Sequence, residues 1–404
     1  MSERNLAPER VRANFRIDLV SALFGALMFS FVVPFMPVIV RRIGGTELEV
    51  SLVIAGAFIG HLLSPIGAYL LARFPLVPVI AVTGNLGRMV FVVGAVVATG
   101  PLALAVAFVG FWIFTLSNVA AYTALMQRLY PDDQRATAMG RVRIGANVTG
   151  VVSAIVGGAI LQVATEPARV LAMAAALSVA GNVIFLRIRH DEPATRPRII
   201  SPRSLLPMVR ADPTYTRFLL AWTVLGAGNL IGATLYPLLL VDRFDAPNAF
   251  VGIYTAATAG ATMLGYWWWG SRIDRGSSIR LTLANSTLLL ALPLVYLFAP
   301  NVWFLLPGAL VAGFTMGAGD LTFFTNLVQL APKGKAADYM AAQSFALGLR
   351  GTIAPFLASG LLLATNATFA LSIVVAIVAI GLLLLRDVTA RVDAREASLQ
   401  PAAF

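Results

Sequence analysis

The sequence predicts an all-α, polytopic membrane protein with 12 transmembrane helices in two pseudo-symmetric six-helix bundles. Of its 404 residues, 58% are hydrophobic and only 12% are charged, which leaves too little polar surface for a soluble globule. The apolar runs are continuous rather than alternating, as in residues 19–40, which carry no charge. Continuous runs favour helices over a membrane barrel.

Each predicted span reaches the roughly 20 residues that a helix needs to cross the hydrocarbon core. The spans are 15–40, 49–72, 76–98, 101–127, 143–164, 167–187, 215–241, 249–270, 279–299, 302–330, 338–363 and 366–386. Between the sixth and seventh spans, charge and proline replace the apolar pattern. We therefore expect an N-terminal bundle over 1–187, a cytoplasmic linker over 188–214, and a C-terminal bundle with a cytoplasmic tail over 215–404.

The net charge of +11 follows the membrane topology, because the basic residues gather between the apolar spans. The predicted inner loops and tails hold 24 Lys and Arg residues, whereas the outer loops hold four. Positive residues remain on the cytoplasmic side, so both termini are predicted to be cytoplasmic, in a bacterial cytoplasmic membrane. The first span, rather than a cleavable signal, is expected to target the chain.

Several classes of chemistry are excluded by the residues that the chain lacks. It has no cysteine and only two histidines, His61 and His190, which excludes thiolate and histidine-cluster metal sites. It also shows no phosphate loop, zinc motif or nucleophile elbow. We expect no metal, no cofactor and no enzymatic activity, and any pumping must draw on an ion gradient.

Asp320 is a carboxylate inside the span 302–330, where a charge costs roughly 2.5 to 3.5 kcal/mol on insertion scales. It lies 13 residues before Lys333, and Arg350 lies 12 residues after Asp338. Both are therefore about 18 to 20 Å from the cytoplasmic ends of successive antiparallel helices, and a bonded pair is geometrically possible. There are three interpretations. The pair pins the two helices together, or Asp320 binds a proton while Arg350 alternates between it and a substrate, or the two residues make no contact.

Three further polar residues in the spans have two interpretations each. His61, central in the second span, either shares the coupling proton or is a packing histidine. Arg88 is either held by carbonyls and amides or faces a wet cavity, in which case two arginines against one aspartate favour an anionic or zwitterionic ligand. Asp18, at the cytoplasmic end of the first span, is expected to pair with Arg141 or Arg143.

The two halves carry a weak internal repeat. An offset of 202 residues places Asn118 on Asp320 and Gln127 on Gln329. On the tenth span, one side of the helix carries Gly313, Gly317, Asp320 and Phe324. The matching side of the fourth span carries Phe111, Thr115, Asn118 and Tyr122. Duplicated halves are typical of transporters that bind their substrate at the repeat interface.

The loop after the eighth span reads Gly270-Ser-Arg-Ile-Asp-Arg-Gly276, followed by Arg280. It resembles the signature loop of the major facilitator superfamily, one residue short of the usual spacing. The loop 131–140 also fits that family's pattern, and the resemblance covers nearly all of the chain. It implies the major facilitator fold, with a cytoplasmic latch formed by Gly270, Asp274 and Arg275.

In that superfamily the first, fourth, seventh and tenth helices line the cavity. The resemblance thus implies a cavity position for both faces related by the repeat, and for the stripe Trp222, Asn229 and Tyr236 on the seventh span. The expected substrate-binding residues are Arg350, Asn118, Thr115, Tyr122, Asn229, Tyr236, Phe324 and Arg88, and the expected proton-coupling residues are Asp320 and His61. Ordinary helix packing is the alternative for the asparagines, aromatics and glycines.

The sequence therefore favours a secondary active transporter that moves a small organic solute by alternating access, coupled to protons, with export as the expected direction. Its expected partners are the solute, protons and membrane lipids but not nucleic acid, and a monomer is expected. Two alternatives remain, a lipid or amphiphile transporter of the same fold and a non-transporting receptor or scaffold. The second is favoured by Arg73, whose loop lacks the acid of the signature.

Overall fold

The computed structural model describes residues 8–71, 74–130, 132–189, 207, 209–273, 276–332 and 335–399. These residues form helices joined by short connections, and no strand occurs among them, which confirms the all-α prediction. Ten of the described helical segments are long and apolar enough to cross a membrane, and Pro101–Leu116 is a shorter apolar helix. Twelve spans are consistent with this count.

The chain divides into two compact units. Unit 1 contains Met1–Ile199 together with Ala246–Ala256, and unit 2 contains Ile200–Asp245 together with Ala257–Phe404. The first division falls within the predicted linker 188–214, most of which lies outside the described residues. No pattern in the sequence indicated that Ala246–Ala256 would pack with the N-terminal helices.

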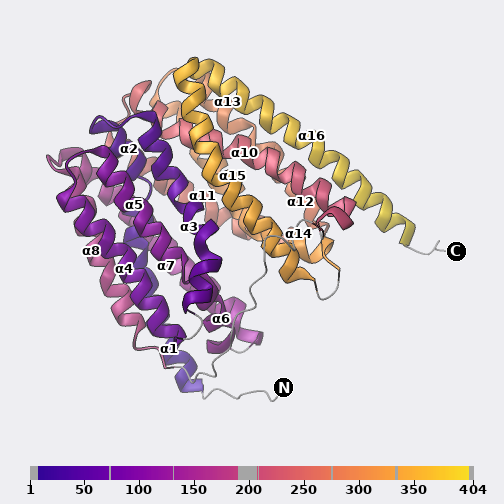
Figure 1. The fold of residues 1–404 in the computed structure, drawn as a ribbon, viewed down its shortest axis with the longest axis horizontal. Coiled ribbons are helices and arrows are strands. Elements are labelled where there is room, and N and C mark those ends of the chain that lie inside the picture. The colour runs from indigo at the N-terminus through magenta and orange to yellow at the C-terminus, as the bar shows by residue number, and fades with distance from the viewer. Residues whose placement is uncertain are drawn as a thin grey trace. The chain divides into compact units, whose positions relative to one another are not determined.

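Unit 1 is a bundle in which α5 lies between α3 and α4, α4 packs on α8, and α1 packs on both α7 and α8 (Figure 1). Its core includes the buried rings of Phe91, Phe108 and Phe111, of which Phe108 and Phe111 stack at 5.7 Å. The helices are α1 (Pro8–Leu27), η1 (Met28–Val32), α2 (Met36–Arg42), α3 (Glu47–Leu71), α4 (Leu76–Val97), α5 (Pro101–Leu116), α6 (Val119–Leu129), α7 (Asp132–Val163) and α8 (Pro167–Phe185).

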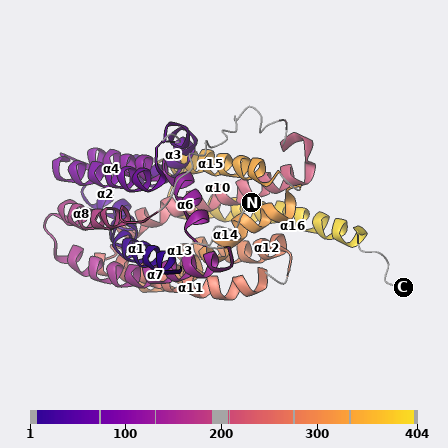
Figure 2. The ribbon, with the colours of Figure 1, turned by 90° about the horizontal axis from the view of Figure 1, so that it is seen from below.

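In unit 2, α10 packs against both α15 and α16, and α12 packs against α14 and α16 (Figures 1 and 2). Tyr215, Phe218 and Leu225 of α10 belong to the hydrophobic core at this junction. The helices are α10 (Pro213–Asp242), α11 (Asn248–Ile273), α12 (Ser278–Leu289), α13 (Ala291–Phe298), η2 (Val302–Leu305), α14 (Leu306–Leu330), α15 (Ala336–Ala364) and α16 (Ala367–Leu399), although α11 begins in unit 1.

Three predicted spans are interrupted helices rather than single ones. The first passes from α1 through the π-helical turn η1 to α2, and Pro34, which has no N–H, lies at the break. The fourth breaks between α5 and α6, where the Ser117 hydroxyl donates back to the Phe114 carbonyl at 2.6 Å. The ninth breaks between α12 and α13, because Pro293 cannot donate to the Leu289 carbonyl.

The first turns of α11 are held in unit 1 by polar and close backbone contacts. Arg42 donates to the Asn248 side chain and to the Ala246 carbonyl, and Asn248 donates to the Leu161 carbonyl at 2.8 Å. Next to them, a Cβ on Gly158 would come within 3.0 Å of the Gly252 Cα. The absence of side chains at this crossing lets α7 and the start of α11 approach closely.

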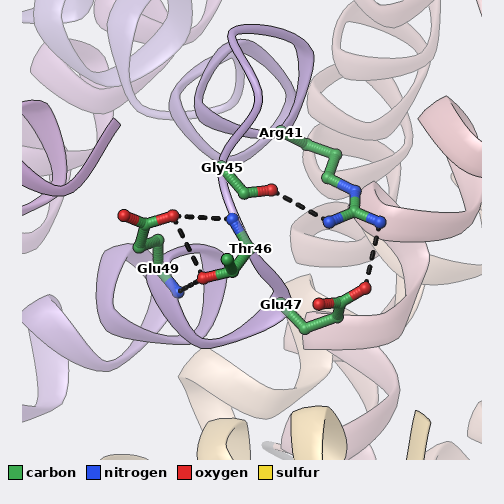
Figure 3. Close-up of polar contacts among 5 residues, drawn as sticks. All are labelled: Arg41, Gly45, Thr46, Glu47 and Glu49. Carbon is green, nitrogen blue, oxygen red and sulfur yellow. Dashed lines mark hydrogen bonds and ion pairs between the residues drawn. The ribbon is translucent and has the colours of Figure 1, made fainter. Parts of the chain in front are cut away.

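The beginning of α3 is fixed by a capping box that Figure 3 shows in detail. Glu49 accepts hydrogen bonds from the Thr46 amide at 2.6 Å and the Thr46 hydroxyl at 3.0 Å, and the Thr46 hydroxyl accepts from the Glu49 amide at 3.3 Å. Arg41 adds an ion pair with Glu47 at 3.0 Å and a bond to the Gly45 carbonyl at 2.9 Å. The connection from α2 to α3 is therefore built from local polar contacts.

We predict that Thr46→Ala lowers the free energy of unfolding by about 1 kcal/mol, because the α3 amide loses its cap. Glu49→Gln is the matched control, since its amide oxygen still accepts from the Thr46 backbone and a smaller loss is expected. Thermal or denaturant unfolding of the purified protein measures both. Equal stability of Thr46→Ala and the wild type would contradict the capping role.

Candidate functional site

The Asp320 carboxylate lies on α14 and is directed to α11. Gly313 and Gly317, on the same side of α14, bring the two helices together, since a Cβ on Gly317 would come within 2.8 Å of the Thr262 carbonyl oxygen. One turn further, Asp320 Oδ2 accepts a hydrogen bond of 2.5 Å from the Tyr266 hydroxyl. Asp320 itself is exposed. The side that the sequence suggested as a cavity lining is therefore, at its glycines, a helix-packing surface.

Arg350 lies in the middle of α15 and its guanidinium is directed to α10. The Cζ atom lies 3.6 Å from the centroid of the Trp222 ring, and Nη1 donates to the Trp222 carbonyl oxygen. Gly226, one turn along α10, leaves room for this group, because a Cβ there would overlap the guanidinium. The Arg350 Nε is buried and has no hydrogen-bond partner among the described residues.

The predicted pair of Asp320 and Arg350 is not formed in this structure. Asp320 bonds to Tyr266 on α11, Arg350 bonds to Trp222 on α10, and the described residues contain no ion pair between the two. Equal depth concerns only position along the membrane normal. It leaves the direction of each side chain around its helix undetermined, and the glycines at 226, 313 and 317 set those directions.

Aromatic rings continue from Arg350 onto α14. The Trp222 ring lies 5.9 Å from that of Phe323, and the Phe323 and Phe324 rings are 5.2 Å apart in an edge arrangement. Phe324 is 58% exposed. We name these four residues, Arg350, Trp222, Phe323 and Phe324, the Arg350 cluster. Beside it, Gln343 donates to the Phe323 carbonyl at 3.3 Å, while its buried Oε1 has no partner within the described structure.

The stripe predicted on the seventh span divides into residues with different surroundings. Trp222 belongs to the Arg350 cluster. Asn229 is half-buried and makes no side-chain hydrogen bond within the described structure. Tyr236 is buried and stacks on Tyr296 of α13 with ring centroids 4.3 Å apart. The contacts of Tyr236 are those of a packing residue.

In unit 1, the residues that the repeat aligned with α14 are directed to other helices. Asn118 is 8% exposed and donates to Thr83 Oγ1 at 2.8 Å and to the Ile80 carbonyl at 3.3 Å, both on α4. Thr115 has a buried hydroxyl without a described partner, and Tyr122 contacts the Phe185 ring at 6.4 Å. Asn118 thus joins the broken fourth span to α4.

The guanidinium of Arg88 has hydrogen-bond acceptors within unit 1. It is 5% exposed, and it donates from Nε to Ser178 Oγ and from Nη1 to the Gly84 carbonyl, both at 2.9 Å. These contacts join α4 to α8 and match the interpretation in which carbonyls and hydroxyls hold the arginine. His61, on α3, is half-buried, and its side chain makes no hydrogen bond among the described residues.

Asp18 does not make the expected ion pair with Arg141 or Arg143. Its carboxylate is 3% exposed and accepts a hydrogen bond of 2.9 Å from Tyr130, which follows the end of α6. Burial raises the pKa of the Tyr130 phenol, and the neighbouring Asp18 carboxylate raises it further. A tyrosine hydroxyl is a sufficient donor here, and sequence reasoning that sought only a cationic partner overlooked it.

The predicted cytoplasmic latch is only partly described. Gly270 lies in the last turns of α11, whereas Asp274 and Arg275 lie outside the described residues. Around them, Arg272 stacks on Trp268 with Cζ 3.4 Å from the ring centroid and donates to the Trp268 carbonyl at 3.0 Å. Arg280 pairs with Asp393 of α16 at 2.7 Å.

Three residues important to these contacts were absent from the sequence prediction, namely Tyr266, Gly226 and Ser178. Tyr266 precedes the Trp267–Trp269 run and is apolar enough to be interpreted with it as an interfacial residue. Ser178 and Gly226 lie in alanine- and glycine-rich stretches with no distinguishing pattern. The one available signal was the four-residue spacing of Trp222 and Gly226, which puts both on one side of α10.

Three solved structures share the fold. A mutant of the nucleoside transporter NupG has a TM-score of 0.74 and 13% identity, covering 93% of this chain and 99% of that one. The peptide transporter POT in complex with sulfate has a TM-score of 0.73 and 13% identity, covering 94% of each chain. A bacterial homologue of the human lysosomal transporter Spinster, inward-facing and unoccupied, has a TM-score of 0.62 and 16% identity, covering 96% of this chain and 95% of that one.

At these identities the structural likeness shows the fold alone. No curated protein sequence matches the chain. A family model described as Major Facilitator Superfamily matches residues 19–355, so the chain belongs to that superfamily. This confirms the resemblance inferred from the loops, and members of the family are generally transporters rather than enzymes.

We predict that Arg88→Lys lowers the free energy of unfolding by about 2 kcal/mol, because an ammonium cannot reproduce the two forked hydrogen bonds of the guanidinium. Denaturant or thermal unfolding of the purified protein measures the loss. Arg391→Lys, at an exposed ion pair with Asp387, is the control and should be nearly neutral. An Arg88→Lys protein of normal stability but altered solute transport would place Arg88 in the cavity instead.

Proposed function

We propose that this protein is a proton-coupled secondary transporter that exports a small organic solute. The observation that carries the proposal is Asp320, an exposed carboxylate inside a membrane-spanning helix that makes no ion pair among the described residues. Carboxylates at such depth are typical of proton relays. The hydroxyl of Tyr266 hydrogen-bonds to the carboxylate without neutralising it, so proton binding remains available.

Alternating access supplies the transport step. In the proposed cycle the protein alternates between two arrangements, and proton binding at Asp320 favours one over the other. His61 is a second candidate proton carrier, because its imidazole lies inside a span without a described partner. No ATP motif appears in the sequence, and a proton gradient is the driving force that these residues support.

The candidate solute-binding residues divide by their surroundings. Arg350 and Phe324 of the Arg350 cluster, and Asn229 on α10, keep polar or aromatic groups without a complete set of described partners. The side chains of Asn118, Arg88 and Tyr236 contact neighbouring helices. In the proposal these three residues hold the helices together and do not bind the solute. Thr115 and Tyr122, on the fourth span, remain proposed solute-binding residues, as the family resemblance implies.

The excess of basic residues in the predicted inner loops supports a placement with both termini in the cytoplasm of a bacterial cell. We further propose that the protein works as a monomer, since each major facilitator chain carries both halves of the repeat. The latch loop between α11 and α12, with Gly270, Asp274 and Arg275, is proposed to close the cytoplasmic side.

We predict that Asp320→Asn abolishes solute accumulation driven by a pH gradient in proteoliposomes, because asparagine has the same shape but cannot bind and release a proton. The solute is first selected by thermal stabilisation of the purified protein across a panel of anions, cations and lipids. Solute exchange without a gradient is expected to persist in the variant.

Asp387→Asn is the matched control for this experiment. It removes another carboxylate of unit 2, but one that is exposed and paired with Arg391 one turn away at 2.8 Å. Accumulation by this control should equal that of the wild type. If Asp320→Asn retains the full dependence on the pH gradient, Asp320 is not the coupling acid.

A further inference from the structure

Arg350 is a half-buried cation, with its Nε buried, and it has no counterion among the described residues. Its nearest predicted acid, Asp320, is bonded to Tyr266 instead, and no ion pair of Arg350 occurs in the described structure. A guanidinium carries five N–H donors. One of them binds the Trp222 carbonyl oxygen, whereas the buried Nε has no described acceptor. Isolated charges inside a protein are costly, so the position calls for an anion.

Arg88 shows what an arginine with a purely structural role looks like in the same chain. It is buried inside a predicted membrane span, and its Nε and Nη1 bind a serine hydroxyl and a backbone carbonyl. Arg350 lacks such acceptors at Nε. The difference between the two residues indicates that Arg350 retains donors for a ligand.

The surroundings of Arg350 favour a particular kind of anion. The Trp222 ring lies under the guanidinium and fixes its plane. A planar guanidinium can bind two oxygens of a carboxylate through the edge of its fork. Phe323 and Phe324 extend an aromatic surface away from Trp222, and Phe324 is largely exposed. A ligand with a carboxylate at one end and an aromatic or apolar body at the other would match both features.

We propose that the Arg350 cluster is the subsite for the carboxylate of an organic anion, which is the substrate class of the transporter. This inference rests on the proposed function, since it names the solute that the proposed transporter carries. Gly226 belongs to the subsite because it makes room for the guanidinium, and Trp222 is a positioning residue.

The test is equilibrium ligand binding, followed as ligand-induced thermal stabilisation of the purified protein in detergent. The probes are matched sets of equal shape and different charge, namely benzoate, phenylacetate and hexanoate, each with its uncharged amide and its corresponding primary amine. At least one of the three acids should raise the melting temperature more than its own amide and its own amine do. If no acid exceeds its amide, the proposal is wrong.

The variant arm assigns the effect to Arg350. Arg350→Gln should raise the half-saturating concentration of the stabilising acid about tenfold or more, because a charge-assisted contact is lost. Arg272→Gln is the control, since it removes a second arginine that stacks on a tryptophan ring and binds that tryptophan's carbonyl, at an exposed position. Equal weakening by both variants, or none by Arg350→Gln, would overturn the assignment.

A second variant covers the case in which Arg350→Gln does not fold. Gly226→Ala keeps every charge but places a methyl group where the guanidinium lies. It should therefore weaken binding of the acid and leave binding of the amide unchanged. An anionic phospholipid is tested in nanodiscs against a neutral one. If only the anionic lipid stabilises the protein through Arg350, and none of the acids does, the proposed ligand is not a soluble organic anion.

The outcome is independent of proton coupling. Binding is measured without a gradient, so a protein in which Asp320 carries no proton still shows stabilisation by the acid if Arg350 binds it. Conversely, a pH-driven transporter of amines or neutral solutes would retain the proposed function while disproving the subsite.

Discussion

The polar groups inside the membrane-spanning helices follow one constraint, namely that an ionisable side chain at that depth needs a partner that compensates for lost water. Arg88 meets it with a serine hydroxyl and a carbonyl, and Asp18 meets it with the hydroxyl of Tyr130. Among the described residues, Asp320 has the Tyr266 hydroxyl as its partner. The described partners are thus neutral donors and acceptors, which hold a charge in place without cancelling it.

Glycine makes these arrangements sterically feasible. On α10, the missing side chain of Gly226 leaves the volume that the Arg350 guanidinium occupies. On α14, Gly317 lets the backbone approach α11 closely enough for Asp320 to reach Tyr266. In both cases a small residue on one helix decides where a charged side chain on the same or a neighbouring helix points. Close packing through small residues is a general means of helix association in membranes.

The sequence was sufficient for the fold and insufficient for the direction of the charged side chains. Long apolar runs and flanking basic residues predict a depth for Asp320 and Arg350 along the membrane normal. Nearly every side of these helices is apolar, however, so periodicity does not say which side meets which neighbour. The repeat did not supply the direction either. It aligned Asn118 with Asp320, but Asn118 bonds to α4 whereas Asp320 bonds to α11. Helix order is repeated between the halves, and helix rotation is not.

The partner of Asp320 lies on the helix that the two units share. α11 starts among residues that pack with unit 1, where Arg42 binds Asn248, and continues into unit 2, where Tyr266 binds Asp320. A hydrogen bond to an ionised carboxylate is roughly twice as strong as one to its neutral form. Protonation of Asp320 would therefore weaken the hold of α14 on the later turns of α11, while the first turns keep their contacts in unit 1. A proton can bias a two-state rearrangement only if it interacts differently with the two states, and in the proposed function the hydrogen bond from Tyr266 to Asp320 is the contact that would differ.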